Sequence, residues 1–122
     1  MQTLTIVVFQ SDARIAQALA AGLSRHFSAV HVMESLRDLQ TAVPRYRADV
    51  AILDIEGTQV AEIERLHREY PGLSIVCTHR VADEEMCANV LQAGASDMCP
   101  TCDTEGIVMS ALRQSPTTHI AA

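Results

Sequence analysis

The sequence predicts an α/β fold with a single doubly wound sheet of five parallel strands flanked by five helices. Short apolar runs alternate five times with amphipathic stretches, which is typical of strand–helix repeats joined by right-handed crossovers. The runs are apolar through their length, as expected when helices cover both faces of a sheet. The chain has 122 residues, which fits one domain of ordinary size.

The five apolar runs are the predicted strands. β-branched residues are frequent in the first run, and the third is the clearest strand, with one apolar residue after another up to Asp54. The fifth run is short and weak. In chain order, the predicted strands cover residues 4–9, 29–33, 49–55, 73–78 and 97–99.

A helix is predicted after each run, and each helix shows apolar residues at helical spacing. The predicted N-caps are Asp12, Ser35, Asp83 and Asp103. The second helix is expected to end before Pro44 and the fourth at Gly94. The inward-facing positions are Ile15, Leu19 and Leu23; Leu36, Leu39 and Val43; Val60, Ile63 and Leu66; Cys87, Val90 and Leu91; and Ile107, Ala111 and Leu112.

Composition and charge exclude several classes of function. The formal charge is −6, and all nine basic residues are arginine, so direct nucleic-acid binding is not expected. No apolar stretch approaches the length of a membrane span, and nothing resembles a signal peptide. We therefore expect a cytoplasmic protein with reduced cysteines. Residues 1–113 form the predicted domain, and residues 114–122 are a flexible tail or the start of a linker.

The loops after the strands are where function is expected. In open parallel sheets, the site lies beyond the carboxyl ends of the strands, where the strand order reverses. That rule selects residues 9–12, 54–57, 78–80 and 99–102. His79 and Arg80 lie in the third of these loops and could meet an anion, but a solvated position is the favoured interpretation.

The sequence resembles the receiver domains of bacterial response regulators. Residues 48–54, ADVAILD, are similar to the strand that carries the phospho-accepting aspartate, and residues 93–97, AGASD, to the turn before the fifth strand. Thr78 stands where the family has its switch Thr or Ser. The resemblance covers residues 3–113 and implies a CheY-like (flavodoxin-like) fold, with Asp54 as the candidate phospho-acceptor. The alternative for Asp54 is a solvated carboxylate at a strand end.

The chain departs from the receiver pattern at the pocket. Asp12 and Glu56 are the candidates to replace part of the acidic pair that holds Mg²⁺, although Asp12 is better interpreted as a helix cap and Glu56 as a loop charge. We therefore expect Mg²⁺ to bind weakly if at all. The degenerate positions are Gln10 and Ser11 for the acidic pair, Thr101 for the lysine and Met98 for the aromatic switch.

The resemblance and these departures together predict a pseudo-receiver. It would be a non-enzymatic signalling module that acts through protein contacts and signals without ordinary Mg²⁺-dependent aspartyl phosphorylation. The implied partners are a histidine kinase or an output domain. A homodimer is also implied, through the face of the fourth helix, fifth strand and fifth helix, where some of four apolar residues should be exposed: Met86, Val90, Val108 and Met109.

Two other functions were weighed. Cys99 and Cys102 form a CxxC pair after the fifth strand, which could make a thiol redox or metal-sensing module, with Cys77 and His79 as further ligands. The favoured interpretation is that these two cysteines are ordinary small side chains without a redox or metal-binding role. A flavodoxin-like enzyme or cofactor binder is disfavoured, because the first strand is followed by no Gly-rich phosphate loop.

Overall fold

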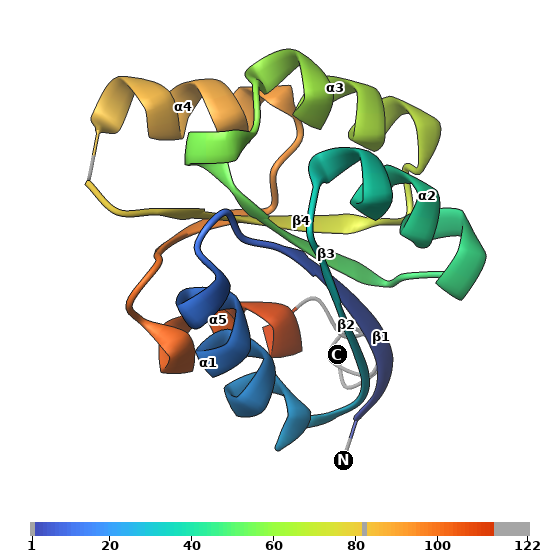
Figure 1. The fold of residues 1–122 in the computed structure, drawn as a ribbon. Coiled ribbons are helices and arrows are strands. Elements are labelled where there is room, and N and C mark those ends of the chain that lie inside the picture. Colours follow the sequence, from blue (N-terminus) through green and yellow to red (C-terminus); the bar gives the residue numbers. More distant parts are fainter. Residues whose placement is uncertain (1, 82, 114–122) are drawn as a thin grey trace.

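The chain forms one five-stranded parallel sheet, as predicted. The computed structural model describes residues 2–81 and 83–113. The strand order is β2-β1-β3-β4-β5 (Figure 1). The strands are β1 (Gln2–Phe9), β2 (Phe27–Met33), β3 (Val50–Asp54), β4 (Ser74–His79) and β5 (Asp97–Pro100).

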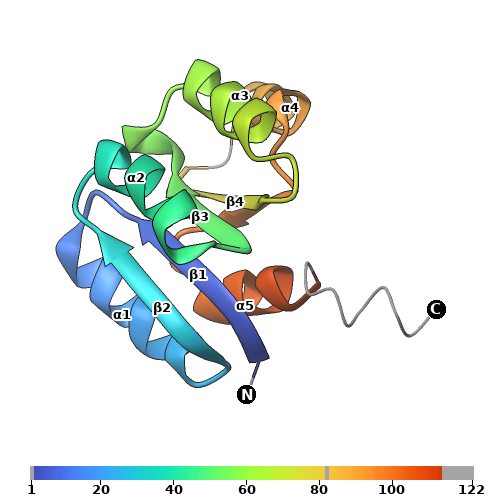
Figure 2. The ribbon, with the colours of Figure 1, turned by 90° about the vertical axis from the view of Figure 1, so that its right-hand side faces the viewer.

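Helices cover both faces of this sheet. Helices α1 and α5 lie on one face, and α2, α3 and α4 lie on the other (Figures 1 and 2). A short 3₁₀ helix, η1 (Ile55–Gly57), follows β3 directly. The α-helices are α1 (Ala13–Ser24), α2 (Leu36–Tyr46), α3 (Val60–Glu69), α4 (Glu84–Ala93) and α5 (Thr104–Arg113).

The core is divided into two layers by the sheet. On β1, Ile6 and Val8 belong to the layer that includes Leu19 of α1 and Ile107 of α5. Val7 belongs to the opposite layer, with Ile63 of α3 and other side chains of α2 and α4. Successive residues of a strand point to opposite faces, and both faces are covered, so uninterrupted apolar runs are what the fold requires.

The predicted helix caps are confirmed. The Asp12 side chain accepts hydrogen bonds from the backbone of α1, and Ser35 and Asp83 do the same for α2 and α4. Asp103 accepts the N–H of Gly106 at 2.9 Å at the start of α5. These caps satisfy N–H groups that have no partner within a helix, so they fix where each helix leaves its strand.

The end of the second helix was predicted wrongly. Helix α2 includes Pro44 and continues to Tyr46. Val43 is only 3% exposed, and Tyr46 packs against the same core layer, so tertiary burial favours one more turn. The helix ends at Arg47, whose left-handed backbone (φ 52°) lets the Ala48 N–H reach the Val43 carbonyl.

Several strand boundaries and one inward position also differ. β1 and β2 each begin two residues earlier than predicted, and β4 begins and ends one residue later. β3 ends at Asp54, because Ile55 begins η1, and β5 extends to Pro100. Leu91, expected on the inward face of α4, is 46% exposed, while Val90 is buried. No helix among residues 2–81 and 83–113 has the length and apolar character needed to cross a bilayer.

Candidate functional site

The site selected from the sequence lies where the strand order reverses. From β1 the chain runs outward to β2 and then returns to β3 on the other side of β1. The loops after β1 and β3 therefore part at the carboxyl edge of the sheet and leave a crevice there. Gln10, Ser11 and Asp12 follow β1, and Asp54 ends β3, so the structure brings these predicted positions together.

Asp54 is a buried carboxylate with several donors around it. Its side chain is 1% exposed, which corrects the alternative of a solvated strand-end carboxylate. Its Oδ2 accepts the Ser11 hydroxyl and, at 3.2 Å, the Ser11 N–H. Its Oδ1 accepts the Glu56 N–H at 3.0 Å. Hydrogen bonds of this kind stabilise a buried carboxylate without a metal ion.

The side chains at and beside the acidic-pair positions make hydrogen bonds to the chain's own backbone. Gln10 is 5% exposed, and its Oε1 accepts the Asp12 N–H at 3.4 Å. Its Nε2 has no hydrogen-bond partner among the described residues. Asp12 caps α1 through its Oδ1, which accepts the Arg14 N–H at 2.9 Å. The preferred interpretation of Asp12 as a helix cap is therefore confirmed.

Arg80 is exposed, in agreement with the favoured interpretation, but it also pairs with two carboxylates at this edge of the sheet. Its guanidinium lies 3.3 Å from Asp12 Oδ2 and its Nε lies 3.6 Å from Glu56 Oε1. The two carboxylates that were weighed as substitutes for the Mg²⁺ ligands thus share one arginine. A signal was present in the sequence, because Arg80 is the single arginine in the four loops that follow strands at this edge.

The side chains at the two switch positions and at the lysine position are buried or packed against the core. Thr78 is opposite Asp54 in the β3–β4 register, and its hydroxyl donates to the Leu53 carbonyl at 3.5 Å. Thr101 is 5% exposed, and its hydroxyl has no hydrogen-bond partner among the described residues. Met98, at the position of the aromatic switch, packs against the core layer beneath α2, α3 and α4.

The cysteines are free thiols in different surroundings. Cys99 is buried and Cys102 is exposed. Burial raises the pKa of Cys99, and the nearby Asp97 charge raises it further. Burial raises the pKa of Cys77 to about 12, with Cys87 and Cys99 adding to the effect. Cys77 belongs to the core layer opposite that of Cys99, so the predicted gathering of three thiols is not formed.

The metal set suggested for these thiols is not assembled either. Within residues 2–81 and 83–113, no three His, Cys, Asp or Glu side chains lie close enough together to hold a metal ion. Thiolates, rather than thiols, are the nucleophiles and metal ligands, and a raised pKa disfavours the thiolate. The CxxC pair therefore has one buried member, Cys99, whose raised pKa disfavours the thiolate, and one exposed member, Cys102.

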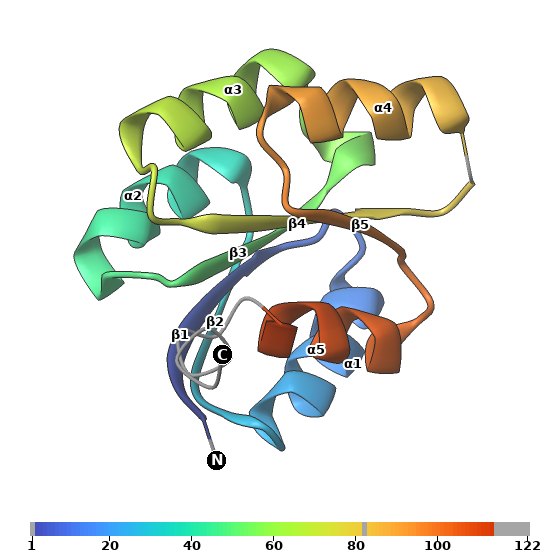
Figure 3. The ribbon, with the colours of Figure 1, turned by 180° about the vertical axis from the view of Figure 1, so that it is seen from behind.

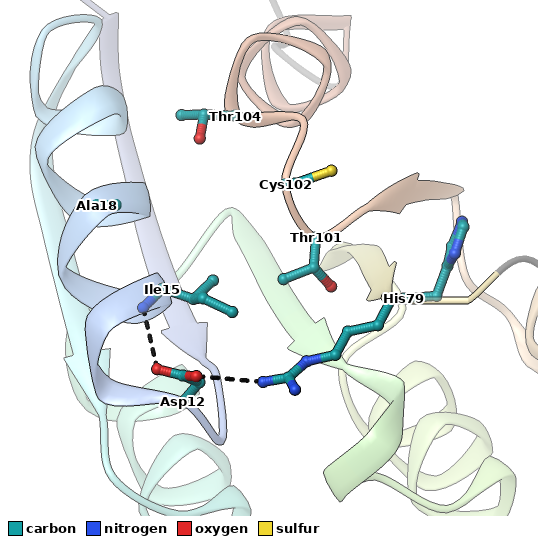
Figure 4. Close-up of a pocket in the computed structure, with 8 residues that line it drawn as sticks. Asp12, Ile15, Ala18, His79, Thr101, Cys102 and Thr104 are labelled. Atoms are coloured by element: carbon teal, nitrogen blue, oxygen red, sulfur yellow. Dashed lines mark hydrogen bonds and ion pairs between the residues drawn. The ribbon is translucent and has the colours of Figure 1, made fainter.

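A cavity of about 480 Å³ lies beside this site, between α1 and the loops after β4 and β5. Figure 4 shows Ile15 and Ala18 of α1 on one side and Thr101 and Cys102 on the other, with Asp12 at the base. Arg80 also lines this space, whereas Asp54 is not among its lining residues.

The structure is similar to solved receiver domains. A response regulator from Thermotoga maritima matches with a TM-score of 0.81 at 18% identity, over 93% of this chain and 98% of its own. NtrX from Brucella abortus matches with a TM-score of 0.85 at 17% identity, over 98% of this chain and 28% of its own. An atypical orphan response regulator, described as having a phosphorylation-independent regulatory mechanism, matches with a TM-score of 0.80 at 13% identity, over 91% and 94%.

These similarities establish the fold. No protein-family model and no curated protein sequence matches the chain. The strand order, the five helices and the similarity to solved structures all give the fold of response-regulator receiver domains, as the resemblance in the sequence implied. At identities below one fifth, they do not specify the chemistry of the pocket.

Proposed function

We propose that this chain is a pseudo-receiver, a signalling module that acts through protein contacts without ordinary Mg²⁺-dependent aspartyl phosphorylation. The observation that carries the proposal is the set of donors on Asp54. The Ser11 hydroxyl and the N–H groups of Ser11 and Glu56 occupy both carboxylate oxygens. In a phosphorylatable pocket, a divalent metal and a lysine would offset the charge of the incoming phosphoryl group.

The remaining charges support the same proposal. Asp12 and Glu56, the two acidic side chains that could stand in for the metal-binding pair, both pair with Arg80. Arg80 therefore supplies a cation from within the chain at the mouth of the pocket. Thr101 at the lysine position provides a short neutral hydroxyl, and with no lysine anywhere in the sequence, no shift of the alignment can place a lysine there.

The implied partners are proteins. We expect a histidine kinase or an output domain to contact the module, and a second copy to contact the face of α4, β5 and α5 (Figure 3). On this face Met109 is 50% exposed and Met86 is half-buried, whereas Val90 and Val108 are buried. Sedimentation of the wild type and of Met109→Glu tests the homodimer. A dimer that the substitution dissociates supports this face, and a monomeric wild type argues against it.

The phosphorylation claim is tested by titrating Mg²⁺ and beryllofluoride into the full chain while recording amide NMR spectra. Beryllofluoride mimics an aspartyl phosphate. We expect no saturable shifts at Asp54, Thr78 or Thr101 at millimolar ligand, while a phosphorylatable receiver domain responds under the same conditions. Saturable shifts that disappear in Asp54→Asn would show a working phospho-switch and overturn the proposal.

A further inference from the structure

The cavity beside the degenerate pocket has hydrogen-bond donors that the chain itself does not use. Thr101 lines this cavity and is 5% exposed, and its hydroxyl has no partner among the described residues. A buried hydroxyl without a partner costs free energy, so a site that leaves one open is suited to an acceptor from outside the chain. In Figure 4, Thr101 lies between Ile15 of α1 and the end of β4.

Arg80 offers further donors beyond those that its two ion pairs engage. A guanidinium has five N–H groups, and the two ion pairs of Arg80 engage its Nε and one terminal nitrogen. Its side chain is 47% exposed, and both of its carboxylate partners are also more than one third exposed. Exposed pairs at 3.3 and 3.6 Å are weak, so Arg80 can accept a further anionic partner at little cost.

The acidic side chain on the cavity wall does not prevent Arg80 from pairing with a further anion. Asp12 is the one carboxylate among the lining residues. Its Oδ1 accepts N–H groups at the start of α1, and its Oδ2 pairs with Arg80. Both oxygens of Asp12 are therefore engaged within the chain.

The opposite wall is apolar. Ile15 and Ala18 of α1 line it, and the half-buried Ile15 is the one member of its predicted helical stripe that is not fully buried. The volume of about 480 Å³ lies within the range of small-molecule sites, which combine apolar walls with a few placed polar groups.

We propose that this cavity binds a small organic anion, with its anionic oxygens at Arg80 and Thr101 and its apolar part against Ile15 and Ala18. The proposal does not depend on whether Asp54 is phosphorylated, because Asp54 does not line the cavity. Such a ligand would bridge α1 and the loops after β4 and β5, and so would act on the same edge of the sheet as the pseudo-receiver pocket.

The first test is a set of amide NMR titrations of the full chain with phenyl phosphate, benzoate, inorganic phosphate and phenol. We expect saturable shifts at Ile15, Thr101 and Cys102 with one or both aromatic anions. Binding of inorganic phosphate and of phenol should be about tenfold weaker, because each lacks one half of the recognised chemistry. The aromatic anion that binds more tightly identifies a phosphate or a carboxylate as the preferred head group.

Substitutions then assign the binding to the cavity. Arg80→Gln and Thr101→Val should each weaken the preferred probe, Arg80→Gln by about tenfold. Arg68→Gln, which removes the same charge from α3, should leave affinity unchanged. Saturation of the cavity should also slow alkylation of Cys102, the exposed thiol that lines it.

Two results would overturn the proposal: no saturable shift with either aromatic anion at 20 mM, or saturable binding that neither Arg80→Gln nor Thr101→Val changes. Asp54→Asn separates this proposal from the previous one. It should abolish any response to beryllofluoride at Asp54, and it should not alter binding of the aromatic anion.

Discussion

Asp54 and Thr101 are two buried polar groups at the same edge of the sheet, and they differ in their partners. The Asp54 carboxylate, 1% exposed, accepts hydrogen bonds on both oxygens from within the chain. The Thr101 hydroxyl, 5% exposed, has no partner among the described residues. In a receiver, an aspartate and a lysine at these positions act together on one phosphoryl group. In this chain, the Asp54 carboxylate is satisfied by internal hydrogen bonds, whereas the Thr101 hydroxyl has no partner among the described residues. We call the Asp54 side of the site its closed half and the Thr101 side its open half.

The largest effect is expected from breaking the closed half. Ser11→Ala removes the hydroxyl that donates to Asp54 and leaves the carboxylate with backbone donors alone. A hydrogen bond to a buried charge contributes about 2 kcal/mol, so the free energy of unfolding should fall by about that amount. Urea unfolding measures it, with Ser24→Ala at the exposed end of α1 as the matched control. Equal losses in the two variants would show that Asp54 does not need Ser11.

Asp97 is a second carboxylate with hydrogen-bond partners within the chain, and the pH dependence of its contribution to stability gives a further test. Burial opposes ionisation of Asp97, but hydrogen bonds from Ser110, from the Met98 N–H and from Arg113 hold its pKa below the ordinary value of 3.8. Asp97→Asn should lower the free energy of unfolding at neutral pH by about 1 kcal/mol, because charge-assisted hydrogen bonds to β5 are lost.

The sign of the pH effect follows from the lowered pKa. A carboxyl with a depressed folded pKa contributes stability that is fully present above its unfolded pKa and is lost as the pH falls through its folded pKa. The difference between wild type and Asp97→Asn should therefore be constant above about pH 5 and shrink as the pH falls below 3.8. Urea unfolding across that range tests this, and a pH-independent difference would contradict it.

Arg80→Gln should lower the free energy of unfolding less than Ser11→Ala or Asp97→Asn does, and it should strengthen the binding of divalent metal ions. Its two ion pairs are exposed, so their loss should cost about 0.5 kcal/mol. Removal of the guanidinium leaves the Asp12 and Glu56 carboxylates without the cation that they share, and carboxylates are the ligands that Mg²⁺ prefers. We expect a millimolar divalent site to appear, seen as broadening of nearby amide signals by Mn²⁺. Arg68→Gln is the control, and equal broadening in all three proteins would refute an internal cation.

The fold was predictable from the sequence because its signals are local and repeated. Five apolar runs indicate the order of the elements, and four capping residues indicate the starts of four helices: Asp12, Ser35, Asp83 and Asp103. The end of α2 was not predictable in this way. Pro44 is a local signal to stop, and the burial of Val43 that overrides it is a contact with distant strands.

The site was predictable in its membership but not in its interactions. Strand topology alone places Ser11 beside Asp54 and Thr78 opposite it. Whether a polar side chain finds a partner depends on side-chain direction across strands far apart in sequence. The pairing of Arg80 with Asp12 spans 68 positions, and no periodicity or spacing indicates it. The burial of Asp54 was missed for the same reason.

The smallest effect is expected at the open half, and its size is the sharpest test of the comparison. Thr101→Val replaces a hydroxyl without a partner by a methyl group, so the free energy of unfolding should stay within about 0.5 kcal/mol of the wild type or rise slightly. Thr78→Val is the matched control on the neighbouring strand: it is equally buried, but its hydroxyl donates to the Leu53 carbonyl.

Thr78→Val should therefore be less stable than Thr101→Val, by about 1 kcal/mol or less, since the Thr78 hydrogen bond is long. The identical change in volume and polarity in the two variants cancels the contribution of packing, so the remaining difference reports the partner alone. If Thr101→Val lost as much stability as Thr78→Val, the Thr101 hydroxyl would have a partner in solution. The Thr101 hydroxyl would then not be available to a ligand in the cavity.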